Sequence, residues 1–382
     1  MKGLPIYYLF LIISLLFSCQ LNTTSEQVRT EIITPSLKQV YQPYFTIGAA
    51  INDNQINEID TAANHLLSTE FSSISPENIM KSMYLHPAKD SFYFEMADKF
   101  VALGEKNKQF IVGHTLIWHS QLSEWIGKIT DKKAMQTAVA DHIQTIVTRY
   151  KGRINGWDVV NEALNEDGTL RESVFLKVMG ENYLSEVFAL AAKADPSVEL
   201  YYNDYNLCRP AKRVGVVNLV KKLQADGVKI DGVGCQAHWS LTNPTLAEIE
   251  NSILAYSDLG MKVMFTEMDI TVIPNPWDLQ GADVDQNFEG SPFMNPYPET
   301  LPDSVQTQLA QRYADIFKLF LKHEDKVSRV TFWGVNDSQS WLNNWPIKNR
   351  TQYPLLFDRQ FQPKKAYHSV MNLRKENNKM KE

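Results

Sequence analysis

Short apolar runs alternate with amphipathic stretches along most of this 382-residue chain. Each run is apolar at successive positions, whereas a strand with one solvent-facing side would alternate apolar and polar residues. Continuous apolar runs are typical of strands in a parallel sheet that is buried on both faces. We expect eight such strands, which begin near Phe45, Phe71, Phe110, Ile154, Val198, Ile230, Lys262 and Val330.

The stretches between these runs have the period of amphipathic helices. The clearest cover Lys132–Thr148 and Ser304–Leu321, and Asp303 or Ser304 is the expected N-terminal cap of the second. Eight strands alternating with helices predict an α/β fold, a (β/α)8 TIM barrel in a single domain over residues 38–374. A doubly wound open sheet is the alternative, but no glycine-rich phosphate turn follows the first strand.

One long segment interrupts this alternation. Residues 274–302 contain six prolines and no apolar periodicity, and they directly follow the seventh expected strand. They therefore predict a long loop at the carboxyl ends of the strands, the face that carries active sites in this kind of barrel. Loops of this length without secondary structure are usually functional or mobile.

The N-terminus predicts export. Met1 and Lys2 are followed by the apolar run Leu4–Phe17 and then by Ser18 and Cys19. This order is typical of a signal peptide over residues 1–18, and the run is shorter than the roughly 20 residues that span a bilayer. The end of the run resembles a bacterial lipobox, which favours lipidation of Cys19 over an ordinary cleavage site.

The terminal segments complete the predicted organisation. Residues 19–37 are polar and are expected to form a tether, and residues 375–382 a flexible tail. The chain would then be exported and held at the bacterial cell envelope by a lipid anchor, its sole contact with a membrane. Whether it faces the periplasm or the outside stays open at this point.

Composition narrows the range of partners. The net charge is −6, and the 38 basic residues form no Lys/Arg run, so the chain lacks the footprint of a nucleic-acid-binding protein. A chain of this size buries a core without disulfides or a structural metal. Cys208 and Cys235 are therefore expected to be two buried thiols. We expect a monomer that uses no metal and no cofactor.

The ends of the expected strands carry carboxylates, amides, imidazoles and tryptophans. Such a mixture is typical of sugar recognition, because amides and charged groups bind hydroxyls while aromatic faces stack on pyranose rings. In chain order these residues are Glu77, Asn78, Lys81, His114, Trp118, His119, Gln121, Asn161, Glu162, Asn203, Asp204, Tyr205, Gln236, His238, Glu267, Asp269, Trp333 and Trp341.

Two glutamates suggest the chemistry. Glu162 and Glu267 each directly follow an apolar strand, the fourth and the seventh, which face one another across the barrel mouth. Glycoside hydrolysis needs one protonated carboxyl group for the leaving oxygen and one ionised carboxylate. A single glutamate at a strand end is more often structural, but two of them beside polar partners favour a catalytic pair.

Seven motifs carry a family resemblance. ENIMK, GHTLIWHSQ, WDVVNEA, YNDYN, GCQAHW, TEMDI and TFWGVNDSQSW occur in this order between about residues 40 and 374. They resemble the strand-end motifs of glycoside hydrolase family 10, the endo-β-1,4-xylanases. The resemblance implies retaining hydrolysis of xylan and xylo-oligosaccharides, with Glu162 as acid/base and Glu267 as nucleophile.

The same resemblance implies the sugar-binding residues. Asn161 would bind the 2-hydroxyl beside the cleavage point, and Glu77, Asn78 and Lys81 would hold the sugar one site away. The rest of the glycone side would consist of His114, Trp118, Gln236, His238, Trp333 and Trp341, with Gln121 and Tyr205 nearby. The chain departs from the family pattern at Cys235, where we expect Met or another apolar residue, and in lacking the frequent carbohydrate-binding module.

Several alternatives remain open. A metal site is one alternative for His114, His119 and His238, but metal-dependent barrel hydrolases usually offer two histidines one residue apart on one strand, a spacing absent here. Trp333 and Trp341 taken alone are equally consistent with core residues, and Asp269 is expected to be structural. Two other functional classes compete: a β-glucanase of the same clan, and an inactive sugar-binding lipoprotein. The presence of both glutamates argues against the second.

Overall fold

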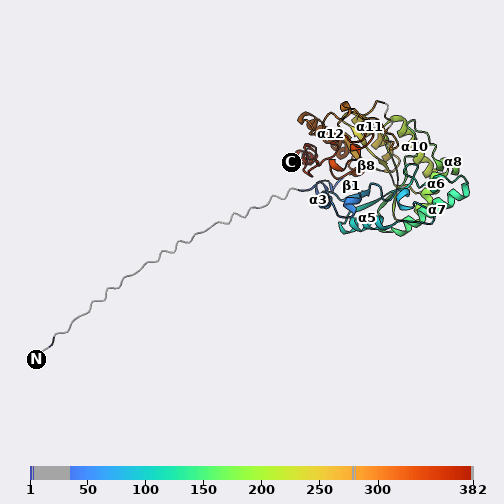
Figure 1. Cartoon of the computed structure of the whole chain (residues 1–382), viewed down its shortest axis with the longest axis horizontal. Helices are drawn as coiled ribbons and strands as arrows, with labels where there is room; N and C mark the ends of the chain where they lie inside the picture. Colours follow the sequence, from blue (N-terminus) through green and yellow to red (C-terminus); the bar gives the residue numbers. More distant parts are fainter. Residues whose placement is uncertain (2, 4–34, 278, 280, 380–382) are drawn as a thin grey trace. The chain divides into compact units, whose positions relative to one another are not determined.

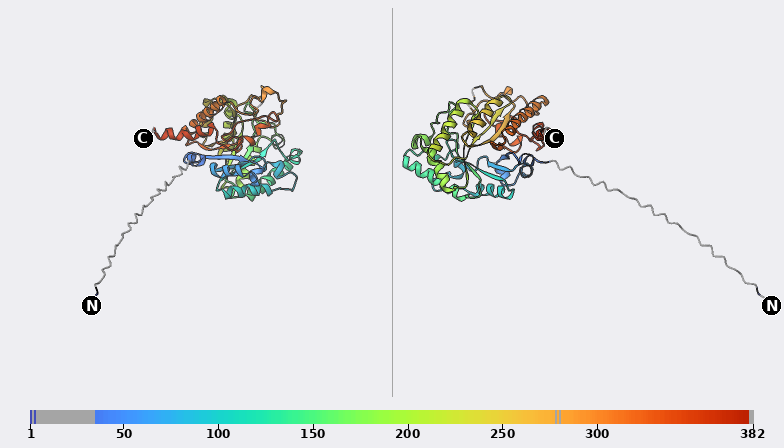
Figure 2. Two further views of the ribbon diagram at one scale, coloured as in Figure 1. Left: turned by 60° about the vertical axis from the view of Figure 1, so that its left-hand side comes forward. Right: turned by 180° about the vertical axis from the view of Figure 1, so that it is seen from behind.

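Residues 1, 3, 35–277, 279 and 281–379 are described by the computed structural model. Within them, eight parallel strands pair side by side, and the pairings β1–β9 and β6–β8 close the sheet into a ring. Helices surround this ring (Figure 1 and Figure 2), which confirms the predicted (β/α)8 barrel. The strands of the ring are β1 (Thr46–Ile51), β2 (Ser73–Pro76), β3 (Phe110–Trp118), β4 (Gly156–Asn161), β5 (Glu199–Asp204), β6 (Gly232–Cys235), β8 (Lys262–Thr271) and β9 (Val327–Phe332).

A ninth, short strand was not predicted from the sequence. β7 (His238–Ser240) follows β6 after two residues and pairs with the far end of β8, with His238 opposite Asp269. Three residues are too few to give a recognisable apolar pattern. The consequence of this pairing is that His238 is held beside the carboxyl end of β8.

The helices differ widely in length. The α-helices are α1 (Leu37–Tyr41), α2 (Asp53–Ile56), α3 (Thr61–Glu70), α4 (Ser82–Leu85), α5 (Glu95–Lys106), α6 (Glu124–Gly127), α7 (Lys132–Arg149), α8 (Val174–Met179), α9 (Tyr183–Ala194), α10 (Pro210–Ala225), α11 (Leu246–Ser257), α12 (Asp303–Lys322) and α13 (Lys365–Lys379). Three single turns of 3-10 helix are η1 (Pro292–Met294), η2 (Asp337–Gln339) and η3 (Trp341–Asn343).

The two helices predicted from apolar periodicity, now α7 and α12, are present within two residues of their expected ends. The predicted cap of α12 is wrong: the chain enters this helix from Pro302, and Asp303 already lies in the first turn. An acidic side chain is favourable there because it faces the positive end of the helix dipole. Helix α13 continues to Lys379, so residues 375–379 of the expected tail are helical.

Helix α12 shows how the outer layer is fastened to the barrel. Tyr313, Ile316, Phe317 and Phe320 lie on one face and are fully buried. The ring of Phe320 stacks on Phe265 of β8, with 4.1 Å between the centroids. Burial of each side chain of this size contributes about 1.5–3 kcal/mol, so this face anchors the helix against the strand that carries Glu267.

Large side chains over glycines fill the inside of the barrel. A β-carbon at Gly113 would lie 2.1 Å from Cε3 of Trp157, and one at Gly156 would lie 2.4 Å from Cε2 of Tyr201. Trp157 and Tyr201 are almost completely buried. The barrel is therefore a packed core rather than a pore, and it gives any pocket at its mouth a solid floor.

Two predictions about the remaining chain are settled within the described residues. Cys208 and Cys235 are free and buried, as expected. The segment 274–302 runs from the end of β8 to α12, with η1 as its one described helical turn. This confirms the predicted long loop at the carboxyl ends of the strands. None of the described helices has the length and hydropathy to cross a bilayer.

The expected signal peptide, apart from Met1 and Gly3, lies outside the described residues. The same holds for Cys19 and for the expected tether as far as Thr34. Leu37, the last residue of that tether, is already buried as the first residue of α1.

Candidate active site

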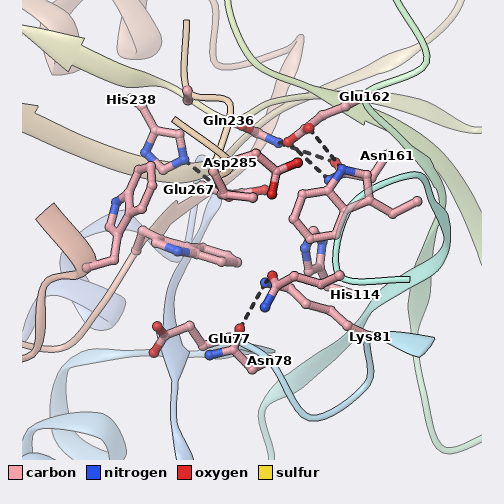
Figure 3. A pocket seen from close by; sticks show the side chains of 16 residues that line it. Glu77, Asn78, Lys81, His114, Asn161, Glu162, Gln236, His238, Glu267 and Asp285 are labelled. Carbon is pink, nitrogen blue, oxygen red and sulfur yellow. Dashed lines mark hydrogen bonds and ion pairs between the residues drawn. The ribbon is translucent and has the colours of Figure 1, made fainter. Parts of the chain in front are cut away.

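Most of the predicted site residues line one pocket at the carboxyl ends of the barrel strands (Figure 3). Its volume is about 300 Å³, at the lower end of the range of roughly 300–1,000 Å³ for small-molecule sites. It therefore suits a short stretch of a polymer. The predicted residues that line it are Glu77, Asn78, Lys81, His114, Trp118, Gln121, Asn161, Glu162, Gln236, His238, Glu267, Trp333 and Trp341.

Glu162 directly follows β4 and is held by neutral hydrogen-bond donors. Its carboxylate oxygens accept hydrogen bonds from Nε1 of Trp118 and Nε2 of Gln236, each 2.9 Å long. Burial of the side chain, together with the nearby charge of Asp204, raises the pKa of Glu162 to about 7. A carboxyl group with this pKa carries a proton near neutrality and can also release it, as an acid/base catalyst must.

Glu267 lies within β8 and has a different set of partners. Its carboxylate accepts a hydrogen bond of 2.7 Å from Nδ2 of Asn203, and Nε2 of His238 lies 3.3 Å away. Burial alone would raise its pKa, but His238, His114 and Asn203 together hold it below the ordinary value. Glu267 is therefore ionised under conditions in which Glu162 is protonated.

His238 owes its charge to Asp269. Nδ1 of His238 forms an ion pair with Oδ1 of Asp269 at 3.0 Å. Burial alone would lower the pKa of His238, but the charge of Asp269 and the contact with Glu267 raise it to about 10. Asp269 also accepts a hydrogen bond of 2.8 Å from Nε1 of Trp341, so it positions two residues that line the pocket.

Lys81 is a buried cation on the opposite wall. Its Nζ donates hydrogen bonds to Oδ1 of Asn78 (2.9 Å) and Oε1 of Gln121 (2.6 Å), and it lies 4.9 Å from the ring centroid of Trp118. Burial lowers the pKa of Lys81 to about 8, although Glu267 and other carboxylates oppose the shift. These contacts fix the amides of Asn78 and Gln121 in place on that wall.

Trp333 and Trp341 form an aromatic wall. The ring of Trp341 stacks on Trp345 behind it, with 4.3 Å between centroids, and lies 4.8 Å from the ring of His238. Trp333 packs edge-on against His114 at 5.5 Å. Because both indoles line the pocket as well as packing against these neighbours, they can offer ring faces to a sugar.

Tyr205 lies outside this pocket. Only 4% of its surface is exposed, its hydroxyl accepts a hydrogen bond of 2.7 Å from Arg171, and Nζ of Lys212 lies 3.7 Å from its ring centroid. The sequence placed Tyr205 near the other site residues because it follows β5. The structure brings it to the barrel mouth but separates it from the lining of the pocket.

Other residues of the site received no binding or catalytic role from the sequence, although Asn203 and Asp269 were among the polar residues noted at the strand ends. Asn203 and Asp269 contact the predicted residues directly, and the signal for Asp269 was its spacing of two from Glu267 on one strand. Ala282, Val284 and Asp285 line the pocket from the long loop. No periodic pattern marks them, so only the length of the loop pointed to a role.

His114 and His238 are each engaged with carboxylates. Nδ1 of His114 lies 2.9 Å from Oδ2 of Asp158, and His238 lies between Glu267 and Asp269. Among the described residues, no three His, Cys, Asp or Glu side chains are grouped as ligands for a metal ion.

Comparison with known proteins identifies the family. The family model described as "Glycosyl hydrolase family 10" matches residues 36–373. The chain belongs to this family. This membership confirms the resemblance that the seven motifs carry. The match to the family model extends over nearly the whole part of the chain that the structure describes.

Two relatives and one solved structure match this chain over most of their own length. "Endo-1,4-beta-xylanase A" of Xylanibacter ruminicola is 41% identical over 344 residues, which cover 89% of this chain and 93% of that protein. "Beta-1,4-xylanase" of Dictyoglomus thermophilum is 40% identical, with 88% and 90% covered. Among solved structures, a GH10 endoxylanase retrieved from a sugarcane soil metagenome has a TM-score of 0.86 and 43% identity, covering 88% of this chain and all of that one.

Proposed function

We propose that this family 10 protein is an endo-1,4-β-xylanase that cleaves the xylan backbone by retaining double displacement. The observation that carries the proposal is the pair of buried carboxylates in one pocket, with the pKa of Glu162 raised to about 7 and that of Glu267 lowered. Opposite shifts of this kind separate an acid from a nucleophile. The relatives are named as xylanases, which supports xylan as the substrate.

Each carboxylate has a role that its contacts favour. Glu267 attacks the anomeric carbon and forms a covalent glycosyl-enzyme, while Glu162 gives its proton to the leaving oxygen. Glu162 then removes a proton from water, which displaces Glu267 with a second inversion. This mechanism predicts that the carboxyl groups are roughly 5–5.5 Å apart, against 6.5–9.5 Å for an inverting enzyme.

The remaining residues of the pocket would bind the glycone. Asn161 donates to the 2-hydroxyl of the sugar at the cleavage point, and Glu77, Asn78 and Lys81 bind the next sugar. The ring faces of Trp333 and Trp341 stack on the sugars. The list is completed by His114, Trp118, Gln121, Gln236 and His238, with Tyr205 on the leaving-group side.

Product analysis on glucuronoxylan and arabinoxylan tests the proposal. We expect a mixture of xylo-oligosaccharides from early times, as endo cleavage requires, and proton NMR should show that the first products keep the β configuration. Products of the α configuration would contradict a retaining mechanism. Turnover of β-glucan but not xylan would indicate a glucanase, and binding of xylan without turnover would indicate an inactive sugar-binding protein.

We also propose that the protein is exported and anchored at the bacterial cell envelope through lipidated Cys19, and that it acts as a monomer on neutral polysaccharide and not on nucleic acid. The run Leu4–Phe17 before Ser18 and Cys19 supports the anchor. Cys19→Ala should move the protein from the membrane fraction to the soluble fraction with unchanged xylanase activity. Unchanged fractionation would show that Cys19 carries no lipid.

A further inference from the structure

Residues 281–285 of the long loop lie across the mouth of the barrel, and we call them the strap. Nε1 of Trp345, after β9, donates a hydrogen bond of 3.2 Å to the carbonyl oxygen of Asp283. The carboxylate of Asp283 lies 3.7 Å from Arg171, in the segment after β4. Because β4 and β9 occupy opposite positions in the eight-stranded ring, Asp283 links two opposite sides of the barrel mouth.

A second contact also joins opposite sides of the barrel mouth. Oγ of Ser120, just after β3, lies 3.4 Å from Oδ2 of Asp285 and donates to it. The strap itself belongs to the loop that leaves β8, and β8 and β3 are also opposite in the ring. The contact between Ser120 and Asp285 therefore joins the β3 and β8 sides of the mouth, whereas Asp283 joins the β4 and β9 sides.

The strap divides the space at the barrel mouth into two pockets. One contains Glu162 and Glu267 and is bordered by Ala282, Val284 and Asp285. The other is lined by residues including Asn206, Arg209 and Asn243, and it shares Ala282 and His238 with the first. Except for His238, the second pocket contains none of the residues proposed for the glycone, and its lining includes Asn206, which directly follows Tyr205 in the chain. We therefore assign it to the leaving-group side.

The strap also covers the aromatic side chain on that side. A β-carbon at Gly281 would lie 2.4 Å from Cε2 of Tyr205, so the strap backbone rests against this ring. Tyr205 is 4% exposed as a result of this contact and of its bonds to neighbouring side chains. In this arrangement its ring has no free face for a leaving-group sugar.

We propose that the strap determines which substrates the enzyme accepts, because a xylan chain has to displace it to pass from the first pocket into the second. This inference rests on the proposed function. A substrate with a small leaving group reacts with the strap in place, whereas a longer chain needs the open form. The side chains of Arg171 and Asp283 are 17% and 30% exposed, so water weakens their attraction and opening is not prohibitive.

The test compares two substrates in the full-length enzyme. Asp283→Lys places a cation beside Arg171, which should open the strap. We expect kcat/KM on xylohexaose, divided by kcat/KM on 4-nitrophenyl β-xylobioside, to rise by about two- to fivefold, the change that loss of a partly exposed ion pair allows. Glu289→Lys is the matched control, since it makes the same charge change at an exposed position of the same loop.

Gly281→Ala is a second variant that leaves all charges in place. The added methyl group would collide with Tyr205 and push the strap away, so the ratio should rise here too. Thermal unfolding confirms that each variant is folded. An unchanged ratio in both would show that the strap does not obstruct the chain, and a lower ratio would show that it binds the chain instead; either result overturns the proposal. Failure of the unaltered enzyme on both substrates would refute the proposed function itself.

Discussion

Glu162 and Glu267 stand in the same pocket and are equally buried, at 4% and 5% exposure, yet their pKa values are displaced in opposite directions. Around Glu162 the donors are neutral, an indole and an amide, and the charge with the largest effect on its pKa is the negative Asp204. Around Glu267 there is a positively charged His238. Burial raises the pKa of both carboxyl groups, and the charge of their neighbours decides whether that rise is increased or reversed. This difference decides which carboxyl group keeps its proton.

The comparison is tested most severely by Glu267→Ala. This change should lower kcat on every substrate by on the order of 10⁵–10⁶-fold, the scale seen when other enzymes lose their nucleophile. Added azide should restore part of the activity, because a small anion fills the vacated position. Glu77→Ala, at a carboxylate of the same pocket outside the catalytic pair, serves as the control and should lose far less. Residual activity near that of the control would contradict the role of Glu267.

Glu162→Ala should give a loss that depends on the leaving group. On xylan we expect a reduction of about 10²–10⁴-fold, the usual contribution of general acid–base catalysis. On 4-nitrophenyl β-xylobioside the first step should be nearly spared, because nitrophenolate needs little protonation. A burst of nitrophenol in rapid mixing would report this. Equal losses on both substrates would mean that Glu162 is not the acid.

The pH profile offers a finer comparison. Activity needs Glu267 ionised and Glu162 protonated, so the rate should fall as the pH drops through the lowered pKa of Glu267 and as it rises through about 7. Asp269→Asn removes the charge that keeps His238 protonated, which raises the pKa of Glu267 and moves the acid limb to higher pH.

Gln236→Leu should act on the other limb. It removes a hydrogen bond to the ionised form of Glu162, so the pKa of Glu162 rises and the basic limb moves to higher pH. Measurement of kcat/KM against pH separates the two variants. Movement of the same limb in both would show that the two carboxyl groups do not have separate surroundings in solution.

A further comparison concerns xylan and cellulose, whose sugars differ by a hydroxymethyl group at carbon 5. Exclusion of that group requires a steric clash, and Trp341 and Gln121 are the large side chains proposed beside it. Trp341→Ala and Gln121→Ala should lower kcat/KM on aryl xylobiosides but raise the cellobioside-to-xylobioside ratio, by about tenfold. Equal proportional losses on the two substrates would mean that these residues bind sugar without selecting it.

The sequence was sufficient for residues whose place depends on the barrel alone. Glu162 and Glu267 follow apolar runs, and the carboxyl end of a parallel strand can only lie at the mouth. Tyr205 directly follows β5, just as Glu162 directly follows β4, so its place at the mouth was predicted, but the end of a strand does not determine which residues of other loops a side chain contacts. Its contact with Arg171, from another loop, is one that the strand end did not predict.

The strap shows where sequence reasoning stops. Residues 281–285 have no periodicity, and their course depends on the ion pair of Asp283 with Arg171 and on the hydrogen bond from Trp345. These partners are far away in the sequence and belong to other loops. A pattern of apolar and polar positions therefore predicted that a long loop exists, and not which of its residues reach the substrate.

Asp269 contacts two residues with different roles, so a mutation at Asp269 changes both contacts at once. One of its oxygens lies against His238, which keeps the nucleophile ionised, and the other accepts the indole hydrogen of Trp341, which is proposed to select the sugar. Any replacement that shifts the indole toward a bulkier substrate would also disturb the proton balance of the reaction. A change at Trp341 that broadens the substrate range of this enzyme would therefore require a compensating second mutation. Changes in the strap, in contrast, leave Asp269 untouched.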